Sequence, residues 1–315
     1  MQKFKSKIKS SFNFFNFLIV FFTFYFLLFT FSDKVAAQEV SLSISPPLTE
    51  IVIQPGKSLN QTITVRNDGV PVTVVAKIVP FVPLDTNGHV ELIEDQNSID
   101  AFSSWFYFDQ RPTSLGVNER HDFIIKITPP DSTEQRDYYF TFLVEVQANN
   151  NIGVNNSESQ ARIGANILLT ATKDGNPQKN VSIVKFSAPK LVDSFTGFSY
   201  QVILGNSGSG FFKPVGKITV DQIFGTTTTL NLAPLNVLVG GEREITCLEG
   251  QEIISCALPG KFLIGIYRAN LSFTVDGVGE SYEKQIYTIA FPFTVLLGLI
   301  TITITYSIIR RLNAN

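Results

Sequence analysis

From residue 40 onward, hydrophobic and polar positions alternate with a period of two, in short runs that turn residues separate. In LNQTITVRNDG, Leu59, Ile63 and Val65 fall on one face of a strand that ends at Asp68-Gly69. VSLSISPP and HDFIIKITPP repeat the pattern, and they end at Pro46-Pro47 and Pro129-Pro130 respectively. Alternation with turn signals about every eight to twelve positions is typical of all-β sandwiches. The pattern therefore predicts a mainly β chain, with almost no helix before its last segment.

The predicted strands form two groups with a linker between them. Asp174-Gly175 and Asn176-Pro177 are consecutive turn signals at the boundary. Roughly 250 residues lie between the two apolar ends of the chain, which is enough for two domains with separate cores. The second group holds seven alternating runs, the strand count of an immunoglobulin-like domain. We therefore predict two tandem immunoglobulin-like β-sandwiches, at 38–174 and 178–287.

The least regular part of the first domain lies between residues 84 and 114. Its DTNG turn at 85–88 resembles the start of a calcium loop, but acidic residues at the required spacing are missing, which favours a solvated loop. The following ELIEDQNSID predicts an acidic loop or a single helical turn. SSWFYFDQ predicts a strand with Trp105 and Tyr107 on one face. These two aromatic residues are candidate ligand contacts, and a core position is the alternative for Trp105.

The last hydrophobic stretch, 289–309, holds 21 residues without a formal charge, and Arg310 and Arg311 follow it directly. As a helix it would be roughly 31 Å long, which matches the hydrocarbon core of a bilayer. We predict a transmembrane helix there, with a cytoplasmic tail at 310–315. A buried core helix or strand is the alternative.

The N-terminal residues predict export. Four lysines between Lys3 and Lys9 precede an apolar run at 12–31, and Val35 and Ala37 occupy the small-residue positions before a cleavage site. We predict a signal peptide at 1–37, with an uncleaved helix as the alternative. Basic residues at both ends stay cytoplasmic, so the two domains face outward from the cell membrane in a single-pass protein.

Charge is distributed unevenly between the two domains. Residues 38–174 contain 17 acidic and 9 basic side chains, whereas 175–287 contain 9 of each. The first domain is therefore near −8 and the second near zero. Nucleic acid and anionic membrane surfaces are poor partners for such a protein, and a cationic or neutral polymer or another protein is a better one.

The two cysteines, Cys247 and Cys256, form an even pair in an exported domain. That context predicts a disulfide that joins two neighbouring strands or the loop between them, with free thiols as the alternative. The two histidines, His89 and His121, lie in the other domain, so a metal or redox site at the cysteines lacks partners. We expect no cofactor and no metal.

Catalysis is the function class that the sequence supports least. His121 stands beside Asp122 at the start of a strand, where neighbouring side chains point to opposite faces. No nucleophile elbow, phosphate loop or zinc spacing is present in the sequence. We therefore expect a binding protein and not an enzyme.

Turn-and-strand motifs in both domains resemble the WxL-interacting proteins, a family of two-domain bacterial surface proteins. The resemblance covers nearly the whole exported region and extends to the C-terminal helix. The segment 135–138, QRDY, departs from the family's Gly-Gly-Tyr turn, a proline near Val239 is missing, and the cysteine pair is an addition. The motifs that carry the resemblance are SISPP, PGKS, TITVRN, ITPPDS, YYFTFLVE and ARIGANILLT in the first domain and GNSG, PVGKI, VLVGGER and GIYRA in the second.

This resemblance implies a division of labour between two immunoglobulin-like domains. The first would bind cell-wall peptidoglycan, and the second would bind a partner protein at the surface. We therefore expect a membrane-anchored adhesion scaffold. The alternative is an accessory subunit or a chaperone-like β-sandwich protein that serves another exported protein, by pairing of strand edges.

Overall fold

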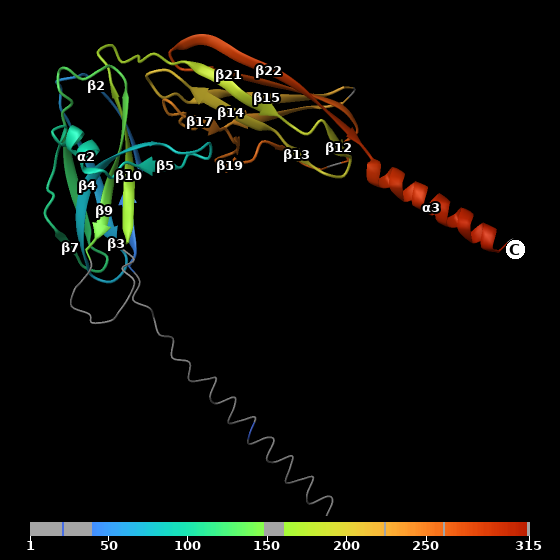
Figure 1. Ribbon diagram of the computed structural model, residues 1–315, viewed down its shortest axis with the longest axis horizontal. Helices are drawn as coiled ribbons and strands as arrows, with labels where there is room; N and C mark the ends of the chain where they lie inside the picture. Colours follow the sequence, from blue (N-terminus) through green and yellow to red (C-terminus); the bar gives the residue numbers. More distant parts are fainter. Residues whose placement is uncertain (1–20, 22–39, 148–160, 224, 261, 314–315) are drawn as a thin grey trace, which may run out of the picture.

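The computed structural model describes Phe21 and residues 40–147, 161–223, 225–260 and 262–313. Two elongated β-domains meet at an angle, and a long helix continues from the far end of the second (Figure 1). Apart from Phe21, the predicted signal peptide at 1–37 lies outside the described residues.

The first domain is a sandwich of two sheets, with strand orders β1-β3-β8-β6 and β2-β10-β9-β4-β5, and β7 pairs with β4. This order corresponds to the two sheets of an immunoglobulin-like domain. Its strands are β1 (Leu42–Ser45), β2 (Leu48–Ile53), β3 (Leu59–Asn67), β4 (Val72–Pro83), β5 (Val90–Leu92), β6 (Phe106–Tyr107), β7 (Thr113–Leu115), β8 (Arg120–Ile127), β9 (Asp137–Val146) and β10 (Arg162–Ala171).

Prolines at the start of the first domain divide its first strand between the two sheets. β1 pairs antiparallel with β3, whereas β2 pairs parallel with β10, the last strand of the domain. Pro46 and Pro47 lie between β1 and β2 and have no N–H to offer a ladder, so β1 ends there and the chain crosses to the opposite sheet. The pattern predicted this boundary correctly.

The second domain repeats the split first strand, because β11 pairs with β14 while β12 pairs parallel with the last strand, β22. Its sheets have the orders β11-β14-β17, β12-β22-β21-β15-β16-β18-β19 and β13-β20. Several short strands add to the seven that were predicted. The strands are β11 (Val181–Ser187), β12 (Leu191–Asp193), β13 (Phe198–Ser199), β14 (Gln201–Asn206), β15 (Pro214–Gln222), β16 (Thr227–Leu232), β17 (Glu242–Glu244), β18 (Cys247–Glu249), β19 (Glu252–Ile254), β20 (Ala257–Leu258), β21 (Gly265–Val275) and β22 (Val278–Phe291).

Each domain has its own hydrophobic core. Ile63 and Val65 of β3 are fully buried, as their alternation predicted, and they belong to the same core as Phe140 and Phe142 of β9. A second core in the other domain is built around Phe273 and its neighbours. β9 is buried on both faces over its first eight residues, because domain two covers part of its outer face.

The C-terminal helix α3 (Phe293–Leu312) begins later than the sequence predicted. Residues 289–291 belong to β22, where Ile289 pairs with both Ile266 and Leu191, and Pro292 ends the strand. At the other end, the helix continues through Arg310 and Arg311, which form its last turn. None of its residues is buried, and the helix is long and apolar enough to cross a membrane, by length and composition.

Two local features refine the predictions. The acidic segment forms a complete helix, α2 (Gln96–Ser103), because the Asp95 carboxylate accepts a hydrogen bond from the backbone N–H of Ser98 at 3.0 Å and caps the first turn. Cys247 and Cys256 form the predicted disulfide, with their Cα atoms 4.9 Å apart. It closes the hairpin of β18 and β19.

Candidate functional site

The two aromatic candidates, Trp105 and Tyr107, lie in opposite environments. Trp105 is only 7% exposed, whereas Tyr107 is 79% exposed. Trp105 directly precedes β6, whose short pairing with β8 turns Phe106 inward and Tyr107 outward. The two side chains therefore do not share a face, which corrects the prediction from the strand pattern.

Trp105 belongs to the aromatic core of the first domain. Its ring meets Tyr138 edge-on at a centroid distance of 4.8 Å and Phe102 of α2 at 5.1 Å. The structure thus places Trp105 in the core, which was the alternative prediction for this residue. Tyr107, in contrast, lines a shallow surface hollow of about 590 Å³ with Ile124 and Lys126 of β8.

The candidate acid–base residues stay apart. The Asp122 carboxylate accepts a hydrogen bond from the hydroxyl of Thr64 at 2.7 Å, and the His121 ring lies against Phe123. His89 contacts Asp85 at 2.7 Å on the surface of the β4–β5 loop. Within the described ranges, no group of three or more His, Cys, Asp or Glu side chains is placed to hold a metal ion.

The junction between the two domains contains a network of buried polar contacts. The Asp137 carboxylate of β9 accepts hydrogen bonds from the backbone N–H of Phe211, in domain two, and from the hydroxyl of Thr170. Burial raises the pKa of Asp137, although these bonds and one from Tyr139 favour its ionised form. The backbone N–H of Asp137 also donates to the carbonyl of Ser209 at 2.8 Å, so this residue is bonded twice to domain two.

Tyr139, two residues further along β9, makes the next connection. Its hydroxyl accepts a hydrogen bond from the backbone N–H of Val239 at 2.9 Å. Its ring stacks on Phe81 and packs with Leu168 against apolar side chains of domain two. Burial raises the pKa of Tyr139, so its phenol stays protonated and donates to Asp137. Together these contacts fix how the two domains sit against each other.

The β4–β5 hairpin forms the other half of the junction. It extends from the first domain toward the second (Figure 1), and the carbonyl of Thr86 at its turn accepts a hydrogen bond from the backbone N–H of Glu244 at 2.7 Å. Gly88 is needed in this turn, because its φ of 88° is left-handed and a Cβ there would collide with the Arg243 guanidinium.

Between the hairpin, β2 and domain two lies a cleft of about 310 Å³. Residues of both domains line it, so it exists only while the domains keep this arrangement. Its apolar walls come from Leu48, Phe81, Leu168, Leu235 and Leu238, and its polar groups from Glu50, Asp85, His89, Lys213, Asn236 and Arg243.

One side of the cleft is closed by a three-residue polar bridge. Glu50 of β2 accepts hydrogen bonds from the Lys213 ammonium and the Asn236 amide, both at 2.8 Å. Burial alone would raise the pKa of Glu50, but the bonds from these two donors lower it. The carbonyl oxygen of the Asn236 side chain is buried and has no hydrogen-bond partner among the described residues.

Arg243 lies on the other side of the cleft and makes no ion pair with any described residue. Its guanidinium lies over Gly88, and its Nε is buried without a hydrogen-bond partner in the part of the chain that the structure describes. No described carboxylate lies within ion-pair distance of it. Burial lowers the pKa of Arg243, and the field of Asp85 opposes that shift. A half-buried guanidinium whose Nε–H has no partner among the described residues is suited to binding a carboxylate.

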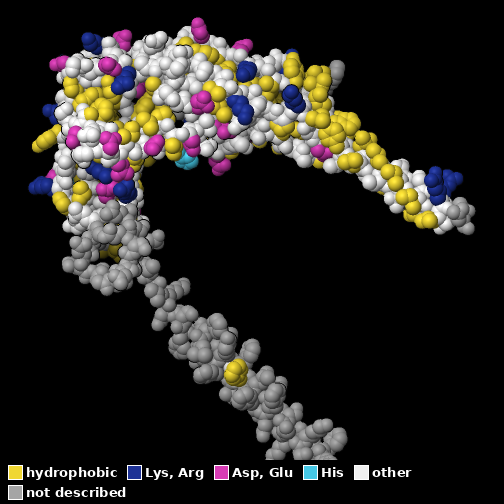
Figure 2. All heavy atoms as spheres, in the orientation of Figure 1, with side chains coloured by type: hydrophobic (Ala, Val, Ile, Leu, Met, Phe, Trp, Pro, Cys, Tyr) yellow, Lys and Arg dark blue, Asp and Glu magenta, His cyan; other side chains and the backbone are white. Residues whose placement is uncertain are grey.

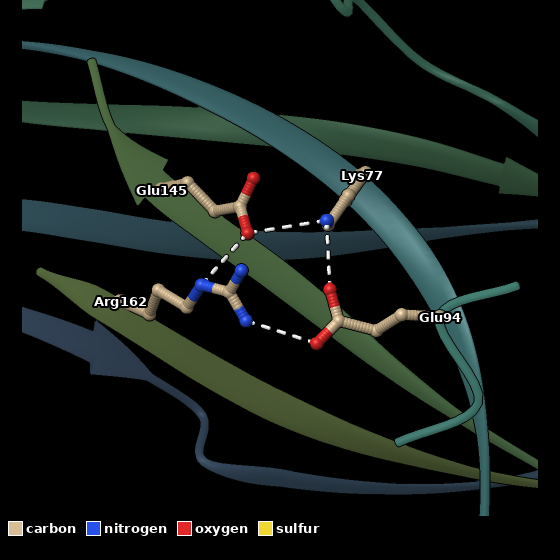
Figure 3. Close-up of polar contacts among 4 residues, drawn as sticks. All are labelled: Lys77, Glu94, Glu145 and Arg162. Atoms are coloured by element: carbon tan, nitrogen blue, oxygen red, sulfur yellow. Dashed lines mark hydrogen bonds and ion pairs between the residues drawn. The ribbon is translucent and has the colours of Figure 1, made fainter. Parts of the chain in front are cut away.

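On the first-domain sheet that contains β4, β9 and β10, four charged side chains form a closed ring (Figure 3). Lys77 of β4 and Arg162 of β10 each pair with both Glu94 and Glu145, at 2.9–3.1 Å. The ring joins three neighbouring strands to the segment that follows β5. All of its charges are satisfied by each other, so it braces the sheet and leaves no free charge for a ligand.

The comparisons with known proteins return structures only. No family model and no curated protein matches the chain. The structure of the class 5 fimbriae chaperone CfaA covers 79% of this chain and 99% of its own, at 8% identity and a TM-score of 0.38. The structure of the E. coli chaperone DraB covers 78% of this chain and 98% of its own, at 14% identity and a TM-score of 0.36. That of the Salmonella enterica SafA pilin in complex with the SafB chaperone covers 80% of this chain and 98% of its own, at 13% identity and a TM-score of 0.38. At these values the similarity assigns no function.

The sequence did not predict that the residues of the cleft come together, although DTNG, His89 and VLVGGER all contribute to its lining. Asp137 and Tyr139 read as part of an ordinary aromatic strand, and Arg243 as one charge in a short strand. One signal was available: Asp137 directly precedes the apolar run YYFTFLV, and a charge at the start of a core strand is seldom buried without partners. Its partners come from a distant segment, which no local pattern identifies.

Proposed function

We propose that this protein is a membrane-anchored accessory subunit that binds a segment of another exported protein in the cleft between its two domains. The observation that carries the proposal is the half-buried Arg243 in the cleft, where no carboxylate among the described residues lies within ion-pair distance of it. A half-buried guanidinium whose Nε has no hydrogen-bond partner among the described residues is costly unless a ligand supplies that partner and a counter-charge.

The chemistry of the cleft defines the ligand. Its size accommodates a few side chains and not a whole domain, and its walls are largely apolar. The ligand would therefore be a short apolar peptide segment with a carboxylate that meets Arg243. The unpartnered Asn236 oxygen on the opposite side would accept an N–H from the same segment.

The helix α3 would hold this cleft at a membrane surface. The junction through Asp137 and Tyr139 keeps the two domains in one arrangement, so the cleft is preorganised for binding. A fixed anchor suits a subunit that receives its partner at the membrane.

Site-specific photo-crosslinking tests this proposal. A photoreactive side chain replaces Leu235 or Leu238 in the cleft, or Val215 as the control, because Val215 is 57% exposed on the same domain but does not line the cleft. In membranes of the producing cell, we expect one adduct of discrete mass from the cleft positions and none from Val215.

Arg243 variants identify the counter-charge. Arg243→Ala should abolish the adduct, and Arg243→Lys should retain part of it, since lysine keeps the charge but not the planar fork. If both cleft positions give no adduct in a correctly folded protein, or if Arg243→Ala leaves the adduct unchanged, the proposal fails.

Attachment of the first domain to peptidoglycan is the second candidate function, and Tyr107 is the observation that favours it. Its exposed ring borders the hollow on β8, where it offers a flat surface to a polymer. Co-sedimentation of the detergent-solubilised chain with insoluble peptidoglycan tests this. Tyr107→Ala should release the protein to the supernatant, whereas Tyr287→Ala, an exposed tyrosine of the second domain, should not. Absence of sedimentation by the unmodified chain would end this candidate.

A further inference from the structure

Exposed apolar side chains gather at the end of domain two from which α3 emerges. Figure 2 shows hydrophobic side chains over this end, continuous with those of the helix. We call them the helix-proximal patch. Its members are 40–56% exposed, and they are Leu191, Phe195, Ile223, Phe262, Ile264, Ile266, Ile289 and Phe291.

Half of the patch is a row across the outer face of the sheet. Leu191 of β12 pairs with Ile289 of β22, which pairs in turn with Ile266 of β21. Ile223 continues the row, because its backbone N–H donates to the carbonyl of Ile266 at 3.0 Å. The solvent face of a soluble sheet normally carries polar residues at such positions. An apolar row here indicates a partner that is itself apolar.

The loops at the tip of the domain supply the rest. The rings of Phe195 and Phe262 meet edge-on at 5.3 Å. The backbone N–H of Leu263, which is buried, donates to the carbonyl of Ser194 at 2.7 Å. This hydrogen bond joins the loop that carries Phe195 to the loop that carries Phe262, and the two rings lie side by side.

The helix is joined rigidly to this patch. Only Pro292 separates β22 from α3, and the Asp193 carboxylate of β12 accepts hydrogen bonds from the backbone N–H and the hydroxyl of Thr294, at 2.9 and 3.2 Å. The N–H of Phe195 donates to the same carboxylate, so the Asp193 carboxylate is fully engaged. The patch therefore keeps its position relative to the helix axis.

The length of the helix places the patch at the bilayer. The uncharged part of α3 runs from Phe293 to Ile309, 17 residues. At about 1.5 Å per residue this is about 25 Å, roughly 5 Å less than a typical hydrocarbon core. The end of β22 can make up this difference, since a strand advances about 3.3 Å per residue and Ile289 and Phe291 are exposed and apolar.

We propose that the helix-proximal patch is a membrane-docking surface that inserts into the outer interface of the bilayer. This inference rests on the proposed function, in that α3 must span the membrane. Insertion is driven by apolar burial and not by charge attraction, because domain two is near neutral. Two attachments, the helix and the patch, would then hold the domain in a fixed tilt, with the cleft at a constant distance from the membrane.

Fluorescence quenching of the full chain in phosphatidylcholine vesicles tests this. Single substitutions Phe195→Cys, Phe262→Cys, Val215→Cys and Leu299→Cys each carry an environment-sensitive label, with the native disulfide left oxidised. The vesicles contain lipids with a nitroxide near the headgroup. Val215 is the matched control at the far end of the same sheet, and Leu299 reports on the anchor.

Docking predicts blue-shifted emission and quenching by nitroxide lipid at positions 195 and 262, and neither effect at 215. If position 299 is in lipid while 195 and 262 stay in water, the docking surface is overturned and the anchor stands. If position 299 also stays in water, the anchor and the docking surface both fail. If labels at 195 and 262 leave water without lipid quenching and transfer energy between copies, a second copy covers the patch and the inference is overturned.

Discussion

The hydroxyl of Tyr139 accepts a hydrogen bond from the backbone N–H of Val239, at 2.9 Å, across the junction between the two domains. The same hydroxyl donates to Asp137 at 3.1 Å, and Asp137 accepts from Phe211 of the second domain. Two segments of domain two, at 211 and 239, are therefore bonded to one strand of domain one. The cleft depends on this relationship.

Tyr139→Phe should loosen the junction while it preserves both cores. The ring can still stack on Phe81, but the N–H of Val239 loses its buried partner, which costs about 1–3 kcal/mol. Hydrogen exchange should accelerate at Val239 and Phe211 and stay unchanged at Ile63. Tyr282→Phe is the control, because Tyr282 also stacks on a phenylalanine and its hydroxyl makes no hydrogen bond among the described contacts. Equal exchange in the two variants would contradict the prediction.

Asp137 should make stability depend on pH with an unusual sign. Burial raises its folded pKa above the unfolded value of about 3.9. Between these two values the folded state holds a proton that the unfolded state has released, so the free energy of unfolding falls as pH rises through that window. Urea unfolding should be compared for the unmodified chain and Asp137→Asn. The difference in their free energies of unfolding should fall above about pH 4 and become constant beyond the raised pKa. An advantage that grows with pH would refute this.

The sequence predicted what depends on local alternation and on turn residues. The mainly β fold, the strand boundaries at Pro46-Pro47 and Pro129-Pro130, and the disulfide are confirmed because each follows from neighbouring residues. The start of α3 was wrong by four residues because strand pairing with Ile266 and Leu191 holds Ile289 in β22. Hydrophobicity alone does not distinguish a strand that leads into a helix from the helix itself.

The candidate site was beyond the reach of the sequence for a different reason. Its residues, such as Glu50, Lys213 and Arg243, come from segments far apart in the chain, and their roles depend on how two domains meet. The register of a two-residue strand likewise decides that Phe106 faces in and Tyr107 faces out. The resemblance to WxL-interacting proteins concerns ligands that the geometry does not test, and it stays a hypothesis.

Trp105→Ala should unfold the first domain and not merely affect binding. The indole is 7% exposed and contacts Tyr138, Phe102 and Phe140, so its removal leaves a large cavity and costs about 3–5 kcal/mol. Tyr107→Ala should change stability by less than about 0.5 kcal/mol, because the ring is largely in solvent. Chemical unfolding followed by aromatic fluorescence compares the two. Similar losses of unfolding free energy in the two variants would contradict the placement of Trp105 in the core and of Tyr107 on the surface.

The ring of ion pairs around Lys77 should contribute a small, salt-dependent stability. Its side chains are 23–42% exposed, so each pair is partly screened, and Arg162→Gln should cost no more than about 1 kcal/mol at low ionic strength. The loss should shrink in molar salt. Arg111→Gln is the control, since its pair with Asp109 is exposed and isolated. A loss for Arg162→Gln that does not depend on salt would indicate a packing role for the guanidinium stem.

The disulfide should stabilise domain two and resist reduction while the domain is folded. Cys247 and Cys256 are 1% and 2% exposed, so a reductant reaches them only after the β18–β19 hairpin opens. On the chain-entropy account, closing a loop of this length contributes roughly 2.5–3 kcal/mol. The double substitution Cys247→Ala with Cys256→Ala should lower the unfolding free energy by that amount, with the first domain unaffected. Thiol titration of the native chain should detect no reactive sulfhydryl until denaturant is added. Rapid reduction under native conditions would show that the hairpin is open in solution.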